Sequence, residues 1–192
     1  MSKYINTTRQ SVFKNTGASG SGSSVGGLFS QTGDSPNNAT ILETTLIDGG
    51  VGSLTVPANG FTVGDSFSIV MGGKVSCSNN SPITIRIKSG AVVLATTGLF
   101  SLHLTTLKNW ELEVTFTIRA IGAAGVASIA THGDFLYIRD SSSNFEGMTF
   151  SSTNNTTFDT TISNTLDITG QWSTLNAANV LYSEIFTLSK IY

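Results

Sequence analysis

Charged side chains are scarce in this sequence. Only 11% of its 192 residues are Asp, Glu, Lys or Arg, against about 25% in an average soluble protein. The formal net charge is −2, and the ten Lys and Arg residues are scattered along the chain. Nucleic-acid-binding surfaces carry clustered cations that neutralise phosphates. We therefore predict no nucleic-acid partner.

Soft metal ligands and long apolar runs are also scarce. The chain has one cysteine, Cys77, and two histidines, so no intrachain disulfide can form and a structural zinc site is not expected. No run of about 18 apolar residues predicts a membrane span. The first ten residues, MSKYINTTRQ, lack the apolar core of a secretory signal. We expect a protein made in a cytoplasm, without metal or cofactor.

The few titratable residues do not form a recognisable catalytic motif. His132 precedes Asp134 by two residues, a spacing that can orient an imidazole, but no nucleophile motif such as GxSxG accompanies it. His103 lies among apolar neighbours, which is typical of a structural histidine. Glu111 and Glu113 share one face of a predicted strand, as solvated carboxylates commonly do. We predict that the chain is not an enzyme.

Hydroxyl and amide side chains supply most of the polarity instead. Ser, Thr and Asn together make up 67 of the 192 residues. Burying such groups costs less free energy than burying ions, so the composition favours a protein that packs against other subunits. A monomeric β-domain with a neutral surface is the alternative interpretation.

The clearest structural pattern lies in residues 110–121, WELEVTFTIRAI. Apolar and polar residues alternate there with a period of two, which predicts a half-buried strand. β-branched and aromatic residues dominate, and no Gly or Pro interrupts them. We expect this segment to be a central strand of an antiparallel sheet. The inward residues would be Trp110, Leu112, Val114, Phe116, Ile118 and Ala120.

Shorter strand patterns occupy much of the chain. Residues 82–97 predict a hairpin that turns at Ser89-Gly90, and Gly72-Gly73 predicts a bulge within a strand. Residues 140–157 are rich in Asn and Ser and predict a loop that carries a short strand. In all, about 8–10 strands separated by turn signals predict an all-β fold, an antiparallel β-sandwich of jelly-roll type. The strand order does not follow from the sequence.

The N-terminal part differs in composition. Nine of the eleven residues in 17–27, GASGSGSSVGG, are Gly or Ser, which is typical of a flexible linker. We predict a flexible N-terminal anchor and linker over 1–30 and a sandwich domain over 31–192. The isolated apolar residues of the tail are candidates for docking on a larger structure, although a frayed terminus would look the same. These candidates are Tyr4, Ile5, Val12 and Phe13.

Several stretches carry a family resemblance: DGGVGSLTVPANGFTVGDSFSI, ITIRIKSG, WELEVTFTIRAIG, GVASIATHGDF and NNTTFDTTISNTLDITGQW. Together they resemble a β-sandwich module of virus-encoded particle proteins, including phage fibre-like or decoration proteins and minor capsid proteins of large DNA viruses. The resemblance covers about residues 31–192. It implies a virion component that is homotrimeric and jelly-roll-like, joined by a terminal peptide to other virion proteins such as the major capsid protein. It carries over no catalytic residues.

A second function stays open at this point. The same scaffold could be a carbohydrate- or receptor-binding module that recognises a host surface glycan. Its sugar platform would use exposed aromatic residues, for which Trp172, Tyr182 and Phe145 are the candidates. An aromatic residue in such a position is also common in a core or an interface.

Overall fold

The computed structural model describes residues 26–36, 38–141 and 144–192. Over these ranges the chain forms thirteen β-strands and no helix. The strands are β1 (Gly26–Gln31), β2 (Thr44–Thr45), β3 (Gly50–Gly52), β4 (Thr55–Val56), β5 (Ser66–Cys77), β6 (Ser81–Ser89), β7 (Val92–Thr96), β8 (Phe100–Leu102), β9 (Thr105–Ala120), β10 (Ser128–Ile138), β11 (Phe145–Asn154), β12 (Asn164–Trp172) and β13 (Val180–Lys190).

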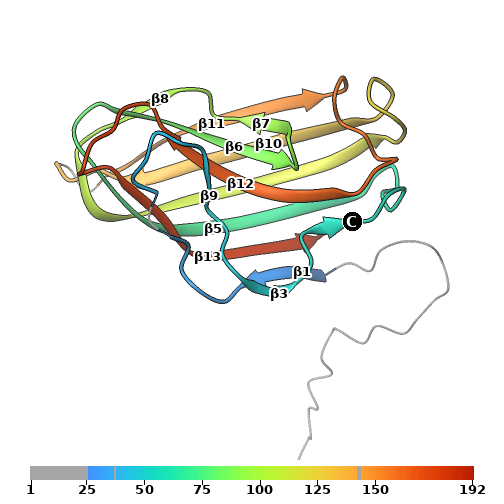
Figure 1. The fold of residues 1–192 in the computed structure, drawn as a ribbon, viewed down its shortest axis with the longest axis horizontal. Helices are drawn as coiled ribbons and strands as arrows, with labels where there is room; N and C mark the ends of the chain where they lie inside the picture. The colour runs from blue at the N-terminus through green and yellow to red at the C-terminus, as the bar shows by residue number, and fades with distance from the viewer. Residues whose placement is uncertain (1–25, 37, 142–143) are drawn as a thin grey trace, which may run out of the picture.

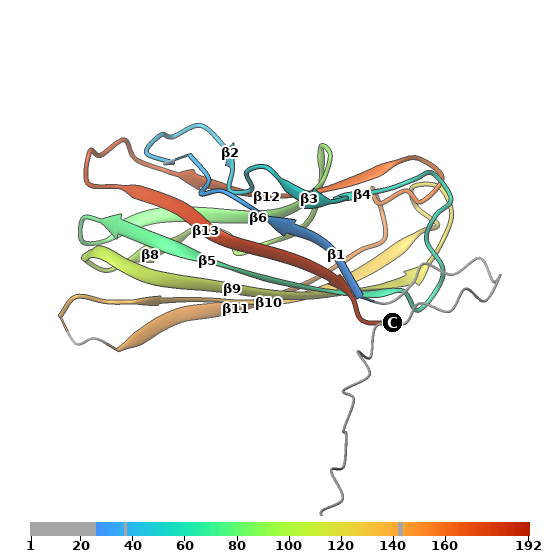
Figure 2. The ribbon, with the colours of Figure 1, turned by 90° about the horizontal axis from the view of Figure 1, so that it is seen from below.

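The strands form two sheets that pack face to face (Figures 1 and 2). Sheet A has the order β11-β10-β9-β5-β13-β1-β3. Sheet B has the order β2-β12-β6-β7, with β4 paired to β12 and β8 paired to β6. The pairs are antiparallel, which confirms the predicted antiparallel β-sandwich. The strand count exceeds the predicted 8–10 because β2, β3, β4 and β8 have only two or three residues each.

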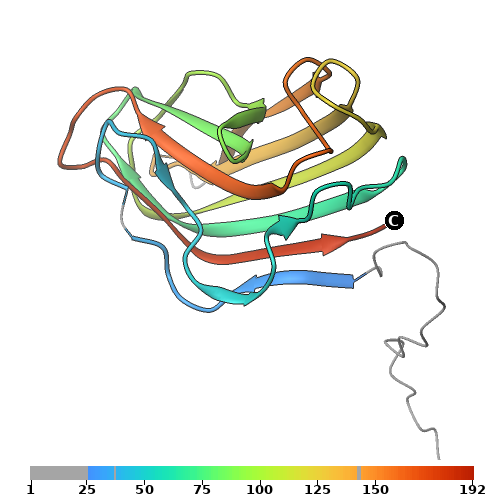
Figure 3. The same ribbon diagram turned by 45° about the vertical axis from the view of Figure 1, so that its right-hand side comes forward.

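The chain crosses repeatedly between the two sheets. It passes from β5 in sheet A to β6 in sheet B, returns from β8 to β9, leaves again from β11 to β12, and ends with β13 in sheet A. β1 pairs with β13, and Gly26 lies opposite Lys190, so the start of β1 and the C-terminus lie at the same end of the sandwich (Figure 3). This connectivity is the jelly-roll type expected from the sequence.

β9 confirms the predicted central strand. It pairs with β5 on one side and with β10 on the other. Its alternate residues from Trp110 to Ile118 are buried against sheet B, and Glu111, Glu113 and Thr115 are exposed. The alternating apolar residues thus form the inner face of β9, and the polar residues between them form its outer face.

The predicted hairpin is also confirmed. β6 and β7 pair across Ser89-Gly90, and Gly90 has a φ of 55°, a value that glycine adopts without strain. Ile83, Ile85 and Ile87 have no exposed surface. Arg86 and Lys88 point outward and contact Glu43, at 3.5 and 2.9 Å.

The predicted bulge at Gly72-Gly73 lies on the neighbouring strand instead. β5 is continuous from Ser66 to Cys77, and the register shifts in β13 between Ser183 and Ile185. A Cβ atom on Gly73 would overlap the backbone carbonyl oxygen of Tyr182. The glycine therefore allows the bulged strand to approach closely.

Two segments predicted as loop or tail belong to the sandwich. Residues 140–157 contain β11, which pairs with β10 from Phe145 to Asn154. The predicted short strand is thus ten residues long, and polar residues on both of its faces hide the alternation. β1 begins within the predicted 1–30 tail and ends at Gln31, and it pairs with β13 and β3. The residues of the proposed docking peptide lie outside the described ranges, as does the linker up to Val25.

One asparagine forms hydrogen bonds to both sheets. The backbone of Asn38 pairs with Leu181 of sheet A, at 2.8 and 3.1 Å. Its side-chain amide donates to the carbonyl of Gly170 in sheet B at 2.8 Å. Its own carbonyl accepts the indole N–H of Trp172 at 2.9 Å. Asn38 is only 1% exposed, so these hydrogen bonds supply the partners that its buried polar groups need.

A buried ion pair lies at the end of the sandwich that holds the C-terminus. Lys190 Nζ lies 2.7 Å from Asp65 Oδ1, and both side chains are almost fully buried. The backbone N–H of Thr62 donates to the other Asp65 oxygen at 3.0 Å. This pair joins the end of β13 to the segment that precedes β5.

We expect Lys190→Met to reduce the free energy of unfolding by about 3–5 kcal/mol, because it leaves the buried Asp65 carboxylate without its partner. Urea unfolding near neutral pH measures the loss. The matched control is Lys108→Met, which removes a more exposed lysine 3.7 Å from Asp140 and should cost no more than about 1 kcal/mol. Equal losses in the two variants would contradict the expectation.

Candidate interaction surface

Exposed apolar side chains gather at one end of the outer face of sheet A. Val70 on β5, Leu136 on β10, Phe145 on β11 and Ile185 on β13 are 40%, 39%, 70% and 52% exposed. These residues line one open groove of about 390 Å³ together with Ile138. We call these five residues the outer apolar patch.

Two backbone features shape this groove. Gly72 lies opposite both Ile185 and Glu111, and its missing side chain lowers the floor. A Cβ atom on Gly72 would lie 3.0 Å from the carbonyl oxygen of Trp110. The bulge in β13 exposes two consecutive residues, Glu184 and Ile185. In a regular strand only one of the two would face outward, so the bulge adds the apolar side chain of Ile185 to the outer face.

The border of the patch is polar and partly acidic. Glu111, Glu184 and Lys74 also line the groove, and Glu113 lies opposite Val70 in the next row of the sheet. Lys74 donates a hydrogen bond to the side chain of Asn109. An apolar centre with a polar rim is the usual anatomy of a protein–protein interface, and a contiguous exposed apolar patch commonly marks such a site.

The sequence contains a local signal for this patch. Strict alternation would place polar residues at positions 70, 136 and 185, but the chain reads Ile69-Val70-Met71, Phe135-Leu136-Tyr137 and Ile185-Phe186. Such consecutive apolar residues indicate a strand that is covered on both faces. Sequence reasoning missed this signal because the buried faces of the same strands were sufficient to explain the apolar content.

The three aromatic candidates for a sugar platform do not come together. Trp172 is wrong as a ligand-facing residue: it is 1% exposed, and its indole N–H is bound to Asn38 in the core. Phe145 and Tyr182 both lie on the outer face of sheet A, but on β11 and β13, four strand spacings apart. At about 4.8 Å per spacing they are roughly 19 Å apart. Of the three, only Phe145 is strongly exposed.

The titratable residues considered for catalysis lie in separate places. The side chain of His132 is 64% exposed and its Nδ1 lies 3.9 Å from Asp134. Glu111 and Glu113 both face outward on β9. His103 belongs to another group, at the end of the sandwich, where its Nδ1 lies 2.9 Å from Glu146 Oε2.

Glu146 is the centre of that second group. Its Oε2 accepts the Tyr137 hydroxyl at 2.7 Å, and its Oε1 accepts a hydrogen bond from Arg139. These hydrogen bonds lower the pKa of Glu146 to about 2, and burial raises the pKa of Tyr137 to about 12. Both values are far from neutrality, where a general acid or base works best. The group links the segment before β9 to β10 and β11.

Other sites for chemistry are limited in the parts of the chain that the structure describes. Within these parts, no three His, Cys, Asp or Glu residues are grouped so as to hold a metal ion. Cys77 is buried, and its burial raises the pKa of its thiol to about 11. Nor do the described residues include a helix that is long and apolar enough to cross a membrane.

Comparison with known proteins does not assign a function to this surface. No protein-family model matches the chain, and no curated protein sequence matches it. The geometry of the chain itself therefore carries the functional argument.

The Glu146 group predicts a specific dependence of stability on pH. Because the pKa of Glu146 is lowered to about 2 in the folded chain, the ionised carboxylate stabilises the fold. This contribution is complete above about pH 4.5 and is lost as the pH falls through about 2. Melting curves of the wild type and Glu146→Gln should differ most near neutrality and converge by about pH 2.

The control for this prediction is Asp34→Asn, which changes an exposed carboxylate after β1. Its melting temperature should follow that of the wild type over the whole pH range. A difference between the wild type and Glu146→Gln that stays constant from neutral to acidic pH would contradict the assignment.

Proposed function

We propose that this chain is a structural component of a virus particle, a minor capsid, decoration or fibre-type protein that acts by self-assembly and by docking to the capsid. The observation that carries the proposal is the outer apolar patch on sheet A. Exposed apolar surface is unfavourable in water and gains free energy when a partner covers it. The resemblance of residues 31–192 to virus-encoded particle proteins agrees with this function.

The remainder of the outer face supports burial in an assembly. Beyond the acidic border, it carries hydroxyl side chains at Ser68, Thr115, Thr117, Ser151 and Thr153, with Arg119, His132 and Asp134 as the ionisable groups among them. These groups lose less on desolvation than ions would. A closed homotrimer in which each chain uses the same surface would cover the patch and limit exposed sheet edges.

Capsid docking is assigned to the N-terminal residues. Residues 1–25 precede β1, which is the second strand from one edge of sheet A. Tyr4, Ile5, Val12 and Phe13 supply the apolar contacts for docking, and the major capsid protein is the proposed partner. The site of action is then the virion, after synthesis in the host cytoplasm.

Glycan binding is the weaker alternative. Burial of Trp172 removes one of its three candidate aromatics, and Phe145 already belongs to the outer apolar patch. A glycan array probed with the purified chain distinguishes the two functions, because saturable binding to one class of glycan would favour the receptor-binding module.

Light scattering on the purified chain tests self-assembly. We expect the mass of three chains of 20.1 kDa each. Ile185→Glu should weaken self-association by at least about tenfold, because it places a charge in the centre of the interface. The control is Ile162→Glu, since Ile162 is 55% exposed and Ile185 is 52% exposed, but Ile162 lies outside the patch. A wild-type monomer, or a trimer that tolerates Ile185→Glu, would overturn the role of the patch.

Deletion of residues 1–25 tests the docking role separately. The deletion stops before Gly26, so that β1 is kept intact. We expect the shortened chain to keep the oligomeric mass and melting temperature of the full chain but to be absent from purified virus particles. Normal incorporation of the shortened chain would rule out the N-terminal segment as the anchor.

A further inference from the structure

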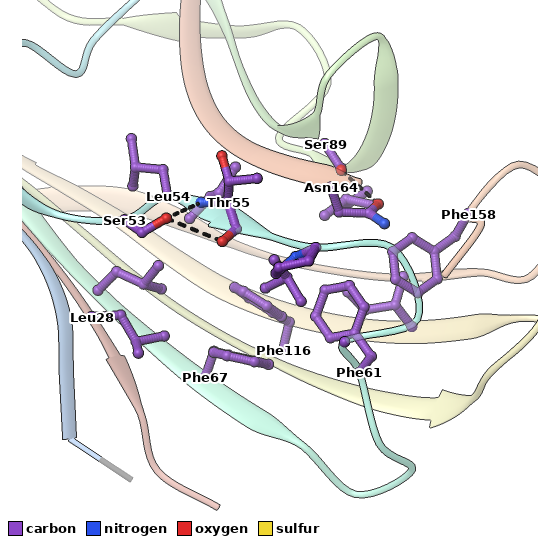
Figure 4. Close-up of a pocket in the computed structure, with 17 residues that line it drawn as sticks. Leu28, Ser53, Leu54, Thr55, Phe61, Phe67, Ser89, Phe116, Phe158 and Asn164 are labelled. Atoms are coloured by element: carbon purple, nitrogen blue, oxygen red, sulfur yellow. Dashed lines mark hydrogen bonds between the residues drawn. The ribbon is translucent and has the colours of Figure 1, made fainter. Parts of the chain in front are cut away.

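A second cavity lies between the two sheets, near the end of the sandwich that holds the C-terminus. Its volume is about 340 Å³, and Figure 4 shows the side chains that surround it. Sheet A supplies Leu28, Phe67, Phe116 and Leu188, and sheet B supplies Leu94 and Leu166. Phe61 and Phe158 come from the connecting segments at this end.

The cavity exists because the two sheets differ in length. β9 has sixteen residues, whereas β6 has nine and β7 has five. Sheet B therefore ends before sheet A does, and β4, its flanking segment and the connection that carries Phe158 border the gap. Side chains from two unequal sheets cannot interdigitate over the whole interface.

Aromatic packing keeps the cavity open. The rings of Phe67 and Phe116 stack with centroids 5.0 Å apart. Phe61 packs edge-on against Phe67 at 6.1 Å and against Phe158 at 5.8 Å. Rings held by one another in this way cannot rotate into the space without losing these contacts. The floor of the cavity is thus a rigid apolar surface.

The cavity is accessible from one side. Ser53, Thr55 and Pro57 line it and are exposed, whereas Phe67, Phe116 and Phe158 are 3%, 6% and 1% exposed. The lining therefore runs from solvent at β4 to the buried core. The part of the lining at β4 is thus the solvent-exposed side of the cavity.

The polar groups in the lining are already hydrogen-bonded within the protein. Ser89 donates to Asn164 Oδ1 at 2.7 Å, and the Asn164 amide donates to the carbonyls of Asp159 and Ile162. The Ser53 hydroxyl donates to the carbonyl of Thr55 at 3.1 Å. No charged side chain lines the cavity in the described chain. The lining therefore offers a ligand apolar contacts, but it offers a charged ligand group no oppositely charged side chain.

We propose that this cavity is a binding site for a neutral, apolar small molecule. An apolar protein cavity of about 150 Å³ holds benzene, so this larger space suits two fused rings or an alkyl chain of roughly ten carbons. A buried carboxylate or ammonium would lose its hydration without gaining a counter-ion. The nearest buried ions, Asp65 and Lys190, pair with each other. This site is independent of the outer apolar patch and of the proposed assembly.

Fluorescence of N-phenyl-1-naphthylamine, a neutral probe that becomes bright in apolar sites, tests the proposal on the full chain. We expect saturable binding of one probe per chain. Leu94→Trp, which fills the cavity from β7, should weaken binding by at least about tenfold, because close-packed interiors do not accommodate added volume. The control Leu42→Trp changes a leucine that is 69% exposed and lies outside the cavity, and it should leave the affinity unchanged.

Two naphthalene derivatives test the charge requirement. 2-Methylnaphthalene and 2-naphthoate share a ring system, and only the second is charged. The first should displace the probe at a concentration at least about tenfold lower. It should also raise the melting temperature of the wild type in a concentration-dependent way, as expected for a ligand of the folded state.

The melting experiment needs no variant, so it remains valid if Leu94→Trp does not fold; Leu28→Trp then fills the cavity from β1. Absence of saturable probe binding would overturn the proposal. So would unchanged binding in a folded filling variant, which would place the probe elsewhere. Equal displacement by the two naphthalene derivatives would overturn the assignment of a neutral ligand.

Discussion

The fold depends on the burial of two apolar sheet faces against each other. In β5, β6 and β9, alternate residues point into this interface, and Ile69, Ile85 and Leu112 have no exposed surface. Removal of such surface from water supplies most of the favourable free energy of folding. Because alternation leaves the other face free, the same strands can present an independent surface to solvent.

At one end the inner faces do not match, and a cavity results. Sheet A extends beyond sheet B, and β4, its neighbouring segment and the connection that carries Phe158 border the gap. The phenylalanines around Phe67 fill part of this space and hold the remainder open through ring contacts. The buried Asp65–Lys190 pair closes the same end by joining β13 to the segment before β5. Ion-pair and aromatic contacts thus act beside aliphatic side chains such as Leu94 and Leu188 at this end.

On the outer face of sheet A, three breaks in the alternation produce the outer apolar patch. Val70 and Leu136 are apolar at outward positions, and the bulge in β13 turns Ile185 outward. None of these side chains contributes to the inner core, so the fold gains little from them. Residues that are unfavourable in an isolated chain and favourable in an assembly suit a protein whose function is to be packed among other subunits. β5 takes part in both sites, since Phe67 lines the inner cavity and Val70 the outer groove.

The sequence by itself determined the features that depend on neighbouring residues. The alternation in residues 110–121 predicted β9, and the Ser89-Gly90 turn predicted the β6–β7 hairpin, because period and turn chemistry are local properties. The all-β antiparallel sandwich followed from the number of such segments.

The tertiary structure alone decided what depends on distant partners. β1 has almost no strand pattern in GGLFSQ and is ordered by backbone hydrogen bonds to β13 and β3. Trp172 is buried without an unpaired indole N–H because Asn38, 134 residues away, accepts that hydrogen bond. The bulge lies in β13. Gly73 of β5 has no side chain that would overlap the backbone of β13 at Tyr182, so the bulged strand can pack close to β5. Alternation shows that a strand has two faces, but only the packing of the whole chain decides which face is covered, by what, and where the cover is incomplete.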